Sequence, residues 1–164
     1  IIVEDAPERG TRFRVLFNAL HEHAVEAHTN ATAPEHTPGP RLQGHVLVVD
    51  DEHAVGAFMR DLLESWGLHV TVTDSARDAL TLAADGALDL DLIITDHKMP
   101  HMTGIQLARE LQQRKPELPV VLYTGFNEGI SREEIAAARL RAMMTKPIDP
   151  HALFGVLQTH LSAH

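Results

Sequence analysis

Polar residues that could carry out phosphoryl chemistry stand at the ends of four short apolar runs of the chain. An Asp-Asp-Glu group follows the run at 45–49, one aspartate follows the run at 92–95, a threonine ends the run at 120–124, and a lysine follows the run at 142–145. Carboxylate, hydroxyl and ammonium groups are the types that attack, hydrogen-bond and neutralise a phosphoryl group. The residues concerned are Asp50, Asp51, Glu52, Asp96, Thr124 and Lys146.

Close approach of these groups would favour a bound cation. Carboxylates a few ångströms apart repel each other, and a protein keeps such a cluster by sharing a proton or by binding a positive ion. An all-oxygen set favours a hard ion, and Mg²⁺ suits one or two carboxylates with water and phosphate. Lys146 would pair with Asp96 or with a phosphoryl oxygen, and Thr124 would donate one hydrogen bond. Together, these carboxylates, the lysine, the threonine and a bound cation are the groups needed to form and hold a phosphoryl group on Asp96.

Each group also has an ordinary explanation when it is taken alone. An aspartate after a strand is commonly a helix cap or a turn residue. Thr-Gly is commonly a turn, and Lys-Pro is commonly a loop. The chemical interpretation therefore depends on the combination, in which each group ends a different strand.

The surrounding pattern predicts strands that alternate with helices. The expected strands are 45–49, 69–73, 92–95, 120–124 and 142–145, and the expected helices are 54–66, 75–84, 103–114, 131–139 and 150–161. Ser131 and Glu134 have the spacing of a capping box. Such alternation predicts an α/β fold, with a five-stranded parallel sheet doubly wound by helices on both faces. Ligands bind such sheets at the carboxyl ends of the strands, where the polar groups lie.

The first 44 residues have a different character. Three prolines and many small polar residues indicate a flexible linker over 28–44. Before it, 1–3 and 13–17 are strand-like with a turn between them, and 21–27 suggests a short helical turn. Two strands alone bury too little surface to be stable, so we expect residues 1–27 to be the end of a preceding domain.

Composition excludes several classes of function. The 164 residues include 14 Lys and Arg against 23 Asp and Glu, a formal net charge of -9, which argues against nucleic-acid binding. The absence of cysteine excludes disulfides and thiolate metal sites. No apolar run approaches the roughly 18 residues that span a bilayer, so we expect no direct membrane contact in this segment. The twelve histidines lack ligand spacing, and we expect surface roles for them, with His97 a candidate for a pH effect at the site.

The four polar groups have the surroundings of a known family. VLVVDDE, LIITDHKMP, VVLYTG and MMTKP resemble, in order and spacing, the signature blocks of the receiver domain of two-component response regulators. The resemblance implies a receiver domain at 45–164, with a flavodoxin-like fold and strand order 2-1-3-4-5. It also implies that Asp96 is the phosphoacceptor, that Thr124 and Lys146 contact the phosphoryl group, and that the Lys146–Pro147 bond is cis.

The same resemblance implies that Mg²⁺ is the cofactor. The expected ligands are the side chains of Asp50, Asp51 and Asp96 and the backbone carbonyl of Lys98. Gly104 matches the glycine of the loop after the phosphoacceptor. Met143 departs from the family, many members of which carry Phe or Tyr three residues before the lysine. This departure puts in question the coupling of phosphorylation to the distal face, but not the chemistry at Asp96.

The leading segment resembles a second family. ERGTRFRVLF is similar to the terminal hairpin of a histidine-kinase ATP-binding domain. We therefore expect the parent to be a hybrid sensor kinase, with kinase core, linker and C-terminal receiver in that order. The expected partners are a histidine kinase core or a histidine phosphotransfer protein. The expected location is cytoplasmic, in a parent that can be attached to the membrane.

The expected function is phosphoryl transfer from a phosphohistidine to Asp96 with Mg²⁺, followed by a conformational switch. Two alternatives stay open. One is a Mg²⁺-dependent aspartyl-phosphate phosphatase, for which the general acid two residues after the nucleophile would have to be Lys98, a poor acid. The other is a docking pseudo-receiver that is not phosphorylated, against which the intact Asp96, Thr124 and Lys146 argue. The receiver itself is expected to catalyse at most its own phosphotransfer.

Overall fold

The computed structural model describes residues 2–5, 11–14, 41–84, 88–125 and 129–161. The chain divides into two compact units, Ile1–Thr37 and Pro38–His164. All of the helices in the described residues belong to the second unit.

The first unit contains a two-stranded antiparallel sheet. β1 (Ile2–Asp5) pairs with β2 (Thr11–Arg14). The sequence pattern predicts these strands at 1–3 and 13–17, whereas β1 continues to Asp5 and β2 already begins at Thr11. Residues 1 and 15–17 of the predicted strands lie outside the described residues. Backbone hydrogen bonds between strands form whatever the polarity of the side chains. The paired strands therefore include polar residues that the sequence pattern places in the turn. The predicted helical turn at 21–27 lies outside the described residues.

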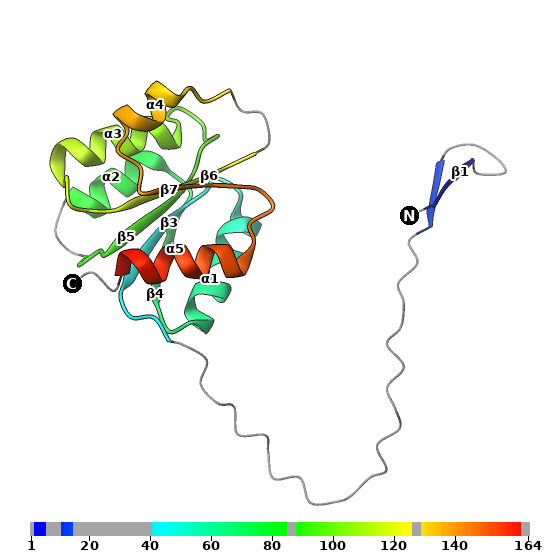
Figure 1. Cartoon of the computed structure of the whole chain (residues 1–164), viewed down its shortest axis with the longest axis horizontal. Coiled ribbons are helices and arrows are strands. Elements are labelled where there is room, and N and C mark those ends of the chain that lie inside the picture. Colours follow the sequence, from blue (N-terminus) through cyan, green and yellow to red (C-terminus); the bar gives the residue numbers. More distant parts are fainter. Residues whose placement is uncertain (1, 6–10, 15–40, 85–87, 126–128, 162–164) are drawn as a thin grey trace, which may run out of the picture. The chain divides into compact units, whose positions relative to one another are not determined.

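The second unit is built on a five-stranded parallel sheet (Figure 1). Its strands lie in the order β4-β3-β5-β6-β7, which is the predicted order 2-1-3-4-5 when the strands of this sheet are numbered along the chain. Every neighbouring pair is parallel, so the predicted fold class is confirmed. The strands are β3 (His45–Val49), β4 (His69–Thr73), β5 (Leu92–Asp96), β6 (Val120–Thr124) and β7 (Ala142–Thr145).

Helices connect these strands and cover both faces of the sheet. Two helices, α1 and α5, lie on one face, and α2, α3 and α4 lie on the other (Figure 1). Their bounds agree with the sequence prediction to within two residues. The helices are α1 (His53–Ser65), α2 (Ala76–Ala84), α3 (Gly104–Arg114), α4 (Arg132–Ala137) and α5 (Pro150–Leu161).

Successive residues of the central strands face opposite sides of the sheet. Leu47 and Ile93 pack on the side of α2 and α3, whereas Val48 and Ile94 pack on the side of α1 and α5. Both sets are buried. Burial on both faces explains why these strands are continuous apolar runs in the sequence rather than alternating ones.

Helix α1 buries only part of its apolar surface. Met59 is fully buried, and Val55 and Leu62 are partly buried against the same core, but Phe58 is 55% exposed. Phe58 is thus a large apolar residue of this helix that lies outside the core. It lies one residue from Met59, which is about 100° of rotation around the helix axis and carries it past the edge of the buried face.

Side-chain caps fix the starts of two helices. Thr103 with Gln106, and Ser131 with Glu134, form reciprocal capping boxes. The second box confirms the prediction made from its spacing. The first box begins α3 at Gly104, which places the start of this helix next to the strand end that carries Asp96.

Candidate functional site

Four predicted site residues lie at the carboxyl ends of strands in the parallel sheet. Asp50 directly follows β3, Asp96 ends β5, Thr124 ends β6 and Lys146 directly follows β7. Backbone hydrogen bonds extend the parallel pairing to this rim: the N–H of Asp50 donates to Thr73, and the N–H of Lys146 donates to Thr124 at 2.8 Å. The sheet thus brings together groups from distant parts of the chain. The Lys146–Pro147 bond is cis, as expected.

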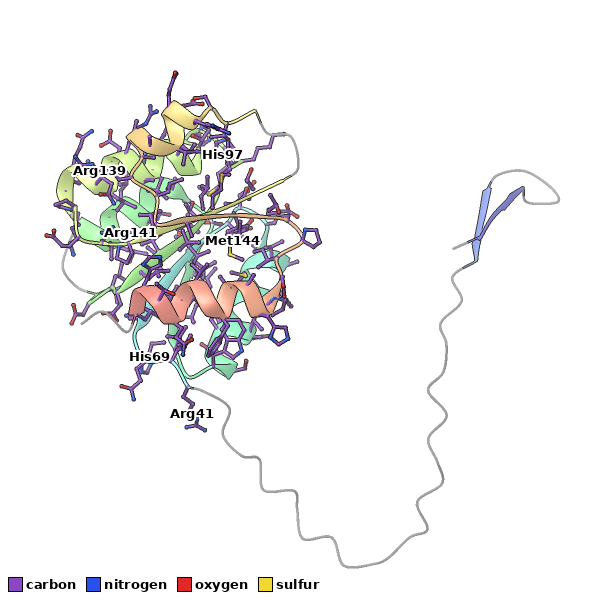
Figure 2. All side chains as sticks on the ribbon, in the orientation of Figure 1. Arg41, His69, His97, Arg139, Arg141 and Met144 are labelled. Atoms are coloured by element: carbon purple, nitrogen blue, oxygen red, sulfur yellow. The ribbon has the colours of Figure 1, made fainter. Side chains whose placement is uncertain are left out.

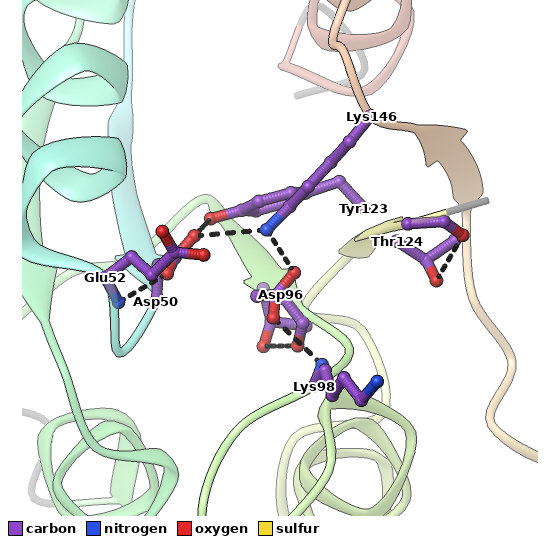
Figure 3. A network of polar contacts seen from close by, with 9 residues as sticks. Asp50, Glu52, Asp96, Lys98, Tyr123, Thr124 and Lys146 are labelled. Atoms are coloured by element: carbon purple, nitrogen blue, oxygen red, sulfur yellow. Dashed lines mark hydrogen bonds and ion pairs between the residues drawn. The ribbon is translucent and has the colours of Figure 1, made fainter. Parts of the chain in front are cut away.

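Lys146 lies between two buried carboxylates (Figure 3). Its Nζ is 2.8 Å from Asp96 Oδ1 and 3.8 Å from Asp50 Oδ2. Burial works against a charge on this lysine, but the hydrogen bond to Asp96 and the charges of Asp96 and Asp50 outweigh it, so the pKa of Lys146 lies above its ordinary value. The lysine is therefore held as a cation that bridges the two aspartates.

Backbone N–H groups hold one oxygen of each aspartate. The N–H of Glu52 donates to Asp50 Oδ1 at 2.7 Å, and the N–H of Lys98 donates to Asp96 Oδ2 at 2.9 Å. Only 1% of Asp50 and 3% of Asp96 is exposed. Two buried carboxylates facing one ammonium leave a net negative charge, and buried charge of this kind calls for a compensating cation.

Sequence reasoning missed one member of the site, Tyr123 in β6. This residue is fully buried, its hydroxyl donates to Asp50 Oδ2 at 2.5 Å, and Lys146 Nζ lies 5.0 Å from the centre of its ring (Figure 3). Burial, together with the hydrogen bond to Asp50, raises the pKa of Tyr123 well above its ordinary value, so the phenol stays protonated and donates. A signal was available, because a tyrosine in a buried strand needs a partner for its hydroxyl.

Thr124 and Gly104 line the part of the site formed by β6 and the start of α3. Thr124 is 4% exposed, and its hydroxyl donates to the carbonyl of Gly125 at 3.4 Å. Gly104 leaves no room for a side chain, because a Cβ atom there would collide with the carbonyl oxygen of Asp96 and stand 2.7 Å from Leu122 Cδ1. The loop after Asp96 therefore packs against the strand ends only with glycine at this position.

Two of the predicted metal ligands are not buried side chains of the cluster. Asp51 is exposed beside Asp50, and Lys98 meets Asp96 through its backbone N–H. Within the described ranges, no three Asp, Glu, His or Cys side chains come close enough to hold a metal ion by themselves. Mg²⁺ does not need such a cage, since it keeps several waters and binds one or two carboxylates. The oxygen atoms and the excess negative charge thus fit a hard ion such as Mg²⁺, which Asp50 and Asp96 would hold from the buried side of the site.

Two of the histidines, His69 and His97, are labelled in Figure 2. His69 and His97 lie far apart (Figure 2). His45 hydrogen-bonds Thr71 at 2.8 Å, and its ring meets that of His69 edge-on at 6.4 Å, at the amino ends of their strands. These contacts are at the opposite end of the sheet from Asp96, so His45 and His69 serve packing rather than the site.

Met143, where this chain differs from many members of the family it resembles, lies in β7, the last strand of the sheet. Met143 is 45% exposed, whereas its neighbours Ala142 and Met144 pack against the core beside α1 and α5. This alternation is the ordinary period of a strand. The thioether of Met143 consequently faces the other side of β7, where solvent reaches it.

Comparison with known proteins points to one family. A sequence model of the response regulator receiver domain matches residues 46–158. The transcriptional regulatory protein FixJ of Azorhizobium caulinodans is 34% identical over 116 residues, which cover 71% of this chain and 54% of that protein. The two-component response regulator ORR5 of Oryza sativa subsp. japonica is 32% identical over 108 residues, which cover 65% of this chain and 80% of that protein.

Solved structures have the same fold. A response regulator receiver domain protein from Clostridium thermocellum matches with a TM-score of 0.66 and 26% identity, over 73% of this chain and 94% of that one. The receiver domain of the sensor histidine kinase PA1611 from Pseudomonas aeruginosa, which has a magnesium ion coordinated in its active site cleft, also matches with a TM-score of 0.66. That match covers 74% of this chain and 99% of the other at 22% identity, and it shows the fold alone.

The chain spans only part of several curated relatives, namely 54% of FixJ and 26% of the transcriptional regulatory protein ZraR of Salmonella typhimurium.

Among the residues with a described position, no helix combines the length and the apolar character needed to cross a membrane.

Proposed function

This chain belongs to the response regulator receiver family of two-component signalling, and on that premise we propose that it accepts a phosphoryl group from a phosphohistidine onto Asp96. The proposal is carried by the placement of the Asp96 carboxylate, which ends a buried strand and is paired with Lys146 at 2.8 Å. Its second oxygen accepts the N–H of Lys98. A carboxylate fixed in this way is a nucleophile with a defined direction of attack.

In the proposed step, an oxygen of Asp96 attacks the phosphorus atom of the donor. The phosphorus–nitrogen bond of the phosphohistidine breaks as the new phosphorus–oxygen bond forms, and the imidazole leaves with the electron pair and takes up a proton. Lys146 exchanges its ion pair with Asp96 for a contact with a phosphoryl oxygen, and Thr124 donates a hydrogen bond to the same group. Both roles are supported by the position of these residues on the rim that carries Asp96.

Receiver domains generally bind Mg²⁺, and the donors at this rim suit it. The proposed ligands are Asp50, Asp51, Asp96 and the backbone carbonyl of Lys98. When bound, the ion neutralises negative charge on the transferring group. The support for Asp50 and Asp96 is their burial against a single ammonium, which leaves negative charge uncompensated.

Phosphorylation is proposed to switch the conformation of the domain. The modification adds negative charge and acceptor oxygens to a crowded site, which draws Lys146 and Thr124 toward the phosphoryl group. Because Lys146 follows β7 and Thr124 ends β6, their movement shifts the face formed by α4, β7 and α5. Partner proteins of the domain would bind that face, and their affinity would change when it shifts.

The proposed donors are a histidine kinase core or a histidine phosphotransfer protein in the cytoplasm. We assign residues 1–27 to the end of a preceding kinase domain, 28–44 to a linker and 45–164 to the receiver of a hybrid sensor kinase. The antiparallel pair of β1 and β2 supports a hairpin in the first segment. Leu42 is 5% exposed and its N–H bonds to Trp66, so packing of the second unit begins shortly before β3.

The test is phosphorylation by a small phosphodonor such as phosphoramidate, read by intact-protein mass spectrometry with and without Mg²⁺. We expect one phosphoryl adduct per chain that requires Mg²⁺ and that is lost in Asp96→Asn. The matched control is Asp74→Asn, because Asp74 follows β4 at the same edge of the sheet but is exposed. A stable adduct in Asp96→Asn would refute the assignment, and catalytic release of phosphate over many turnovers would favour a phosphatase instead.

A further inference from the structure

Tyr123 takes no part in the phosphoryl transfer described above, yet it is bonded to a residue of that site. We infer that Tyr123 is a positioning residue, whose hydroxyl holds the Asp50 carboxylate in the orientation that receives the divalent cation. The inference rests on the proposed function, because it takes Asp50 as a ligand of that cation.

The Tyr123 hydroxyl reaches Asp50 across an intervening strand. In the sheet, β5 lies between β3 and β6, and Tyr123 pairs directly with Asp96 of β5. Adjacent strands are about 4.8 Å apart, so the contact joins backbones that are separated by two such spacings. A side chain that ends in a donor must be long and stiff to bridge this gap, and the phenol of tyrosine is both.

The core of the protein sets the position of the Tyr123 ring. The residue is fully buried in the apolar cluster on the α1 and α5 side of the sheet, which includes Ile94, Val121 and Leu153. Tight packing of this kind fixes the two torsions of the side chain, so the hydroxyl stays in place whether or not a cation is bound. The donor is therefore part of the rigid scaffold rather than of the mobile site.

Asp50 has two short hydrogen bonds and one longer ion pair, and the ion pair is the contact that breaks most easily. Its Oδ1 accepts the backbone N–H of Glu52 at 2.7 Å, and its Oδ2 accepts the Tyr123 hydroxyl at 2.5 Å. The ammonium of Lys146 is farther away, at 3.8 Å from Oδ2, and 30% of its side chain is exposed. Lys146 can leave Asp50 when positive charge arrives, whereas Tyr123 and Glu52 continue to define the plane of the carboxylate.

Loss of the Tyr123 hydroxyl should therefore weaken cation binding without removing a ligand. Hydrogen-bonding partners of metal ligands typically change metal affinity by about 10–100-fold when they are removed. Tyr123→Phe keeps the ring, its packing and its contact with Lys146. We expect this variant to bind Mg²⁺ about 10-fold more weakly than the wild type.

The experiment measures Mg²⁺ binding to the full chain by isothermal titration calorimetry. The proteins compared are the wild type, Tyr123→Phe, Asp50→Asn, the double variant and Thr95→Val. The last is a control for loss of a buried hydroxyl on a central strand, because the Thr95 hydroxyl donates to the backbone carbonyl of Asp96 and not to a carboxylate of the site. We expect a weaker Kd in Tyr123→Phe, a Kd near the wild type in Thr95→Val, and no additional weakening when Tyr123→Phe is added to Asp50→Asn.

A second measurement needs no variant. Tyr123 is the single tyrosine of the chain, so tyrosine labelled with ¹³C on its ring gives one set of NMR signals from one residue. If its hydroxyl holds a ligand of the cation, those signals shift as Mg²⁺ is added, with the same midpoint as the calorimetric titration. Unchanged signals at saturating Mg²⁺ overturn the inference even if Tyr123→Phe does not fold.

The outcomes separate this inference from the proposed function. Mg²⁺ binding by Asp50→Asn that equals the wild type refutes the assignment of Asp50 as a ligand, and with it the proposed site. Weak binding in Asp50→Asn together with wild-type binding in Tyr123→Phe refutes only the role of Tyr123. Equal weakening by Tyr123→Phe in the wild-type and Asp50→Asn backgrounds also refutes that role, because the hydroxyl would then act through another group.

Discussion

Lys146 Nζ lies 2.8 Å from Asp96 Oδ1, on the carboxylate that we propose as the phosphoacceptor. The same ammonium is 3.8 Å from Asp50 Oδ2. In this arrangement the lysine supplies part of the positive charge that two buried carboxylates require. If the proposed cation binds beside Asp50 and Asp96, the lysine would compete with it, because like charges repel.

Replacing Lys146 by methionine should therefore strengthen Mg²⁺ binding and destabilise the Mg²⁺-free protein. Loss of a unit positive charge this close to the ligands should raise the affinity by about 10-fold. Breaking a buried ion pair costs about 3–5 kcal/mol, and partial exposure of the lysine reduces this to about 1–3 kcal/mol. Calorimetric Mg²⁺ titration and urea denaturation with and without Mg²⁺ measure the two effects.

The control for this change is Lys115→Met, since Lys115 lies at the end of α3 and its replacement alters the net charge equally. We expect little change in Mg²⁺ affinity there, because screening weakens distant surface charges. Weaker Mg²⁺ binding in Lys146→Met than in the wild type would contradict the competition described above.

Gly104→Ala should destabilise the domain, because the added methyl group would collide with the backbone carbonyl of Asp96 and with Leu122. Overpacking against an immobile backbone costs about 1–3 kcal/mol. The matched control is Gly155→Ala in α5, where a Cβ atom has nothing within 4 Å. Removing a glycine from a helix interior should stabilise the protein by about 0.5–1 kcal/mol. Urea denaturation of both variants should thus give free energies of unfolding that change in opposite directions.

Much of the site could be predicted because each residue follows its own apolar run. Parallel strands bring their carboxyl ends to one rim, so the sequence positions of Asp50, Asp96, Thr124 and Lys146 predict that they share this rim. The fold class follows from the same alternation of strands and helices, whereas the strand order is implied by the family resemblance alone. The roles of these residues stay predictions until the labelling experiment is done.

Other features depend on side-chain direction, which the sequence does not encode locally. Asp50 and Asp51 are adjacent in the sequence, yet one is buried and the other exposed, because neighbouring residues leave a strand end in different directions. The contact of Tyr123 with Asp50 depends on the order of three strands, so no local pattern specifies it. Phe58 and Met59 differ only in rotation around α1.

The different burial of those two neighbours in α1 predicts different costs of truncation. Met59→Ala removes a fully buried side chain and should lower the free energy of unfolding by about 2–5 kcal/mol. Phe58→Ala removes a side chain that is 55% exposed and should cost less than about 1 kcal/mol. Urea denaturation measures both losses. Each variant is the control for the other, because both replace a large apolar side chain by alanine at neighbouring positions of the same helix. Equal losses would mean that the face of α1 assigned to the core is wrong.

Glu134 should make the stability of the domain sensitive to acid. Hydrogen bonds from the backbone N–H and the side chain of Ser131 lower the pKa of Glu134 below its ordinary value of 4.5. A carboxyl whose pKa is lower in the folded state adds stability that is fully present above the unfolded value, and that is lost as the pH falls from 4.5 through the folded pKa. Glu134→Gln keeps an oxygen that can accept the backbone N–H but cannot ionise.

The wild type should therefore unfold at a higher urea concentration than Glu134→Gln at about pH 7, and the gap between their midpoints should close in the acid range. Glu133→Gln is the control, because it makes the same change of charge one residue earlier in the first turn of α4 without touching the capping box. A gap that is the same at neutral and acid pH would show that ionisation of Glu134 is not linked to folding. If the gap closes for Glu134→Gln but is absent for Glu133→Gln, the acid sensitivity comes from the cap and not from the general attraction of a helix N-terminus for negative charge.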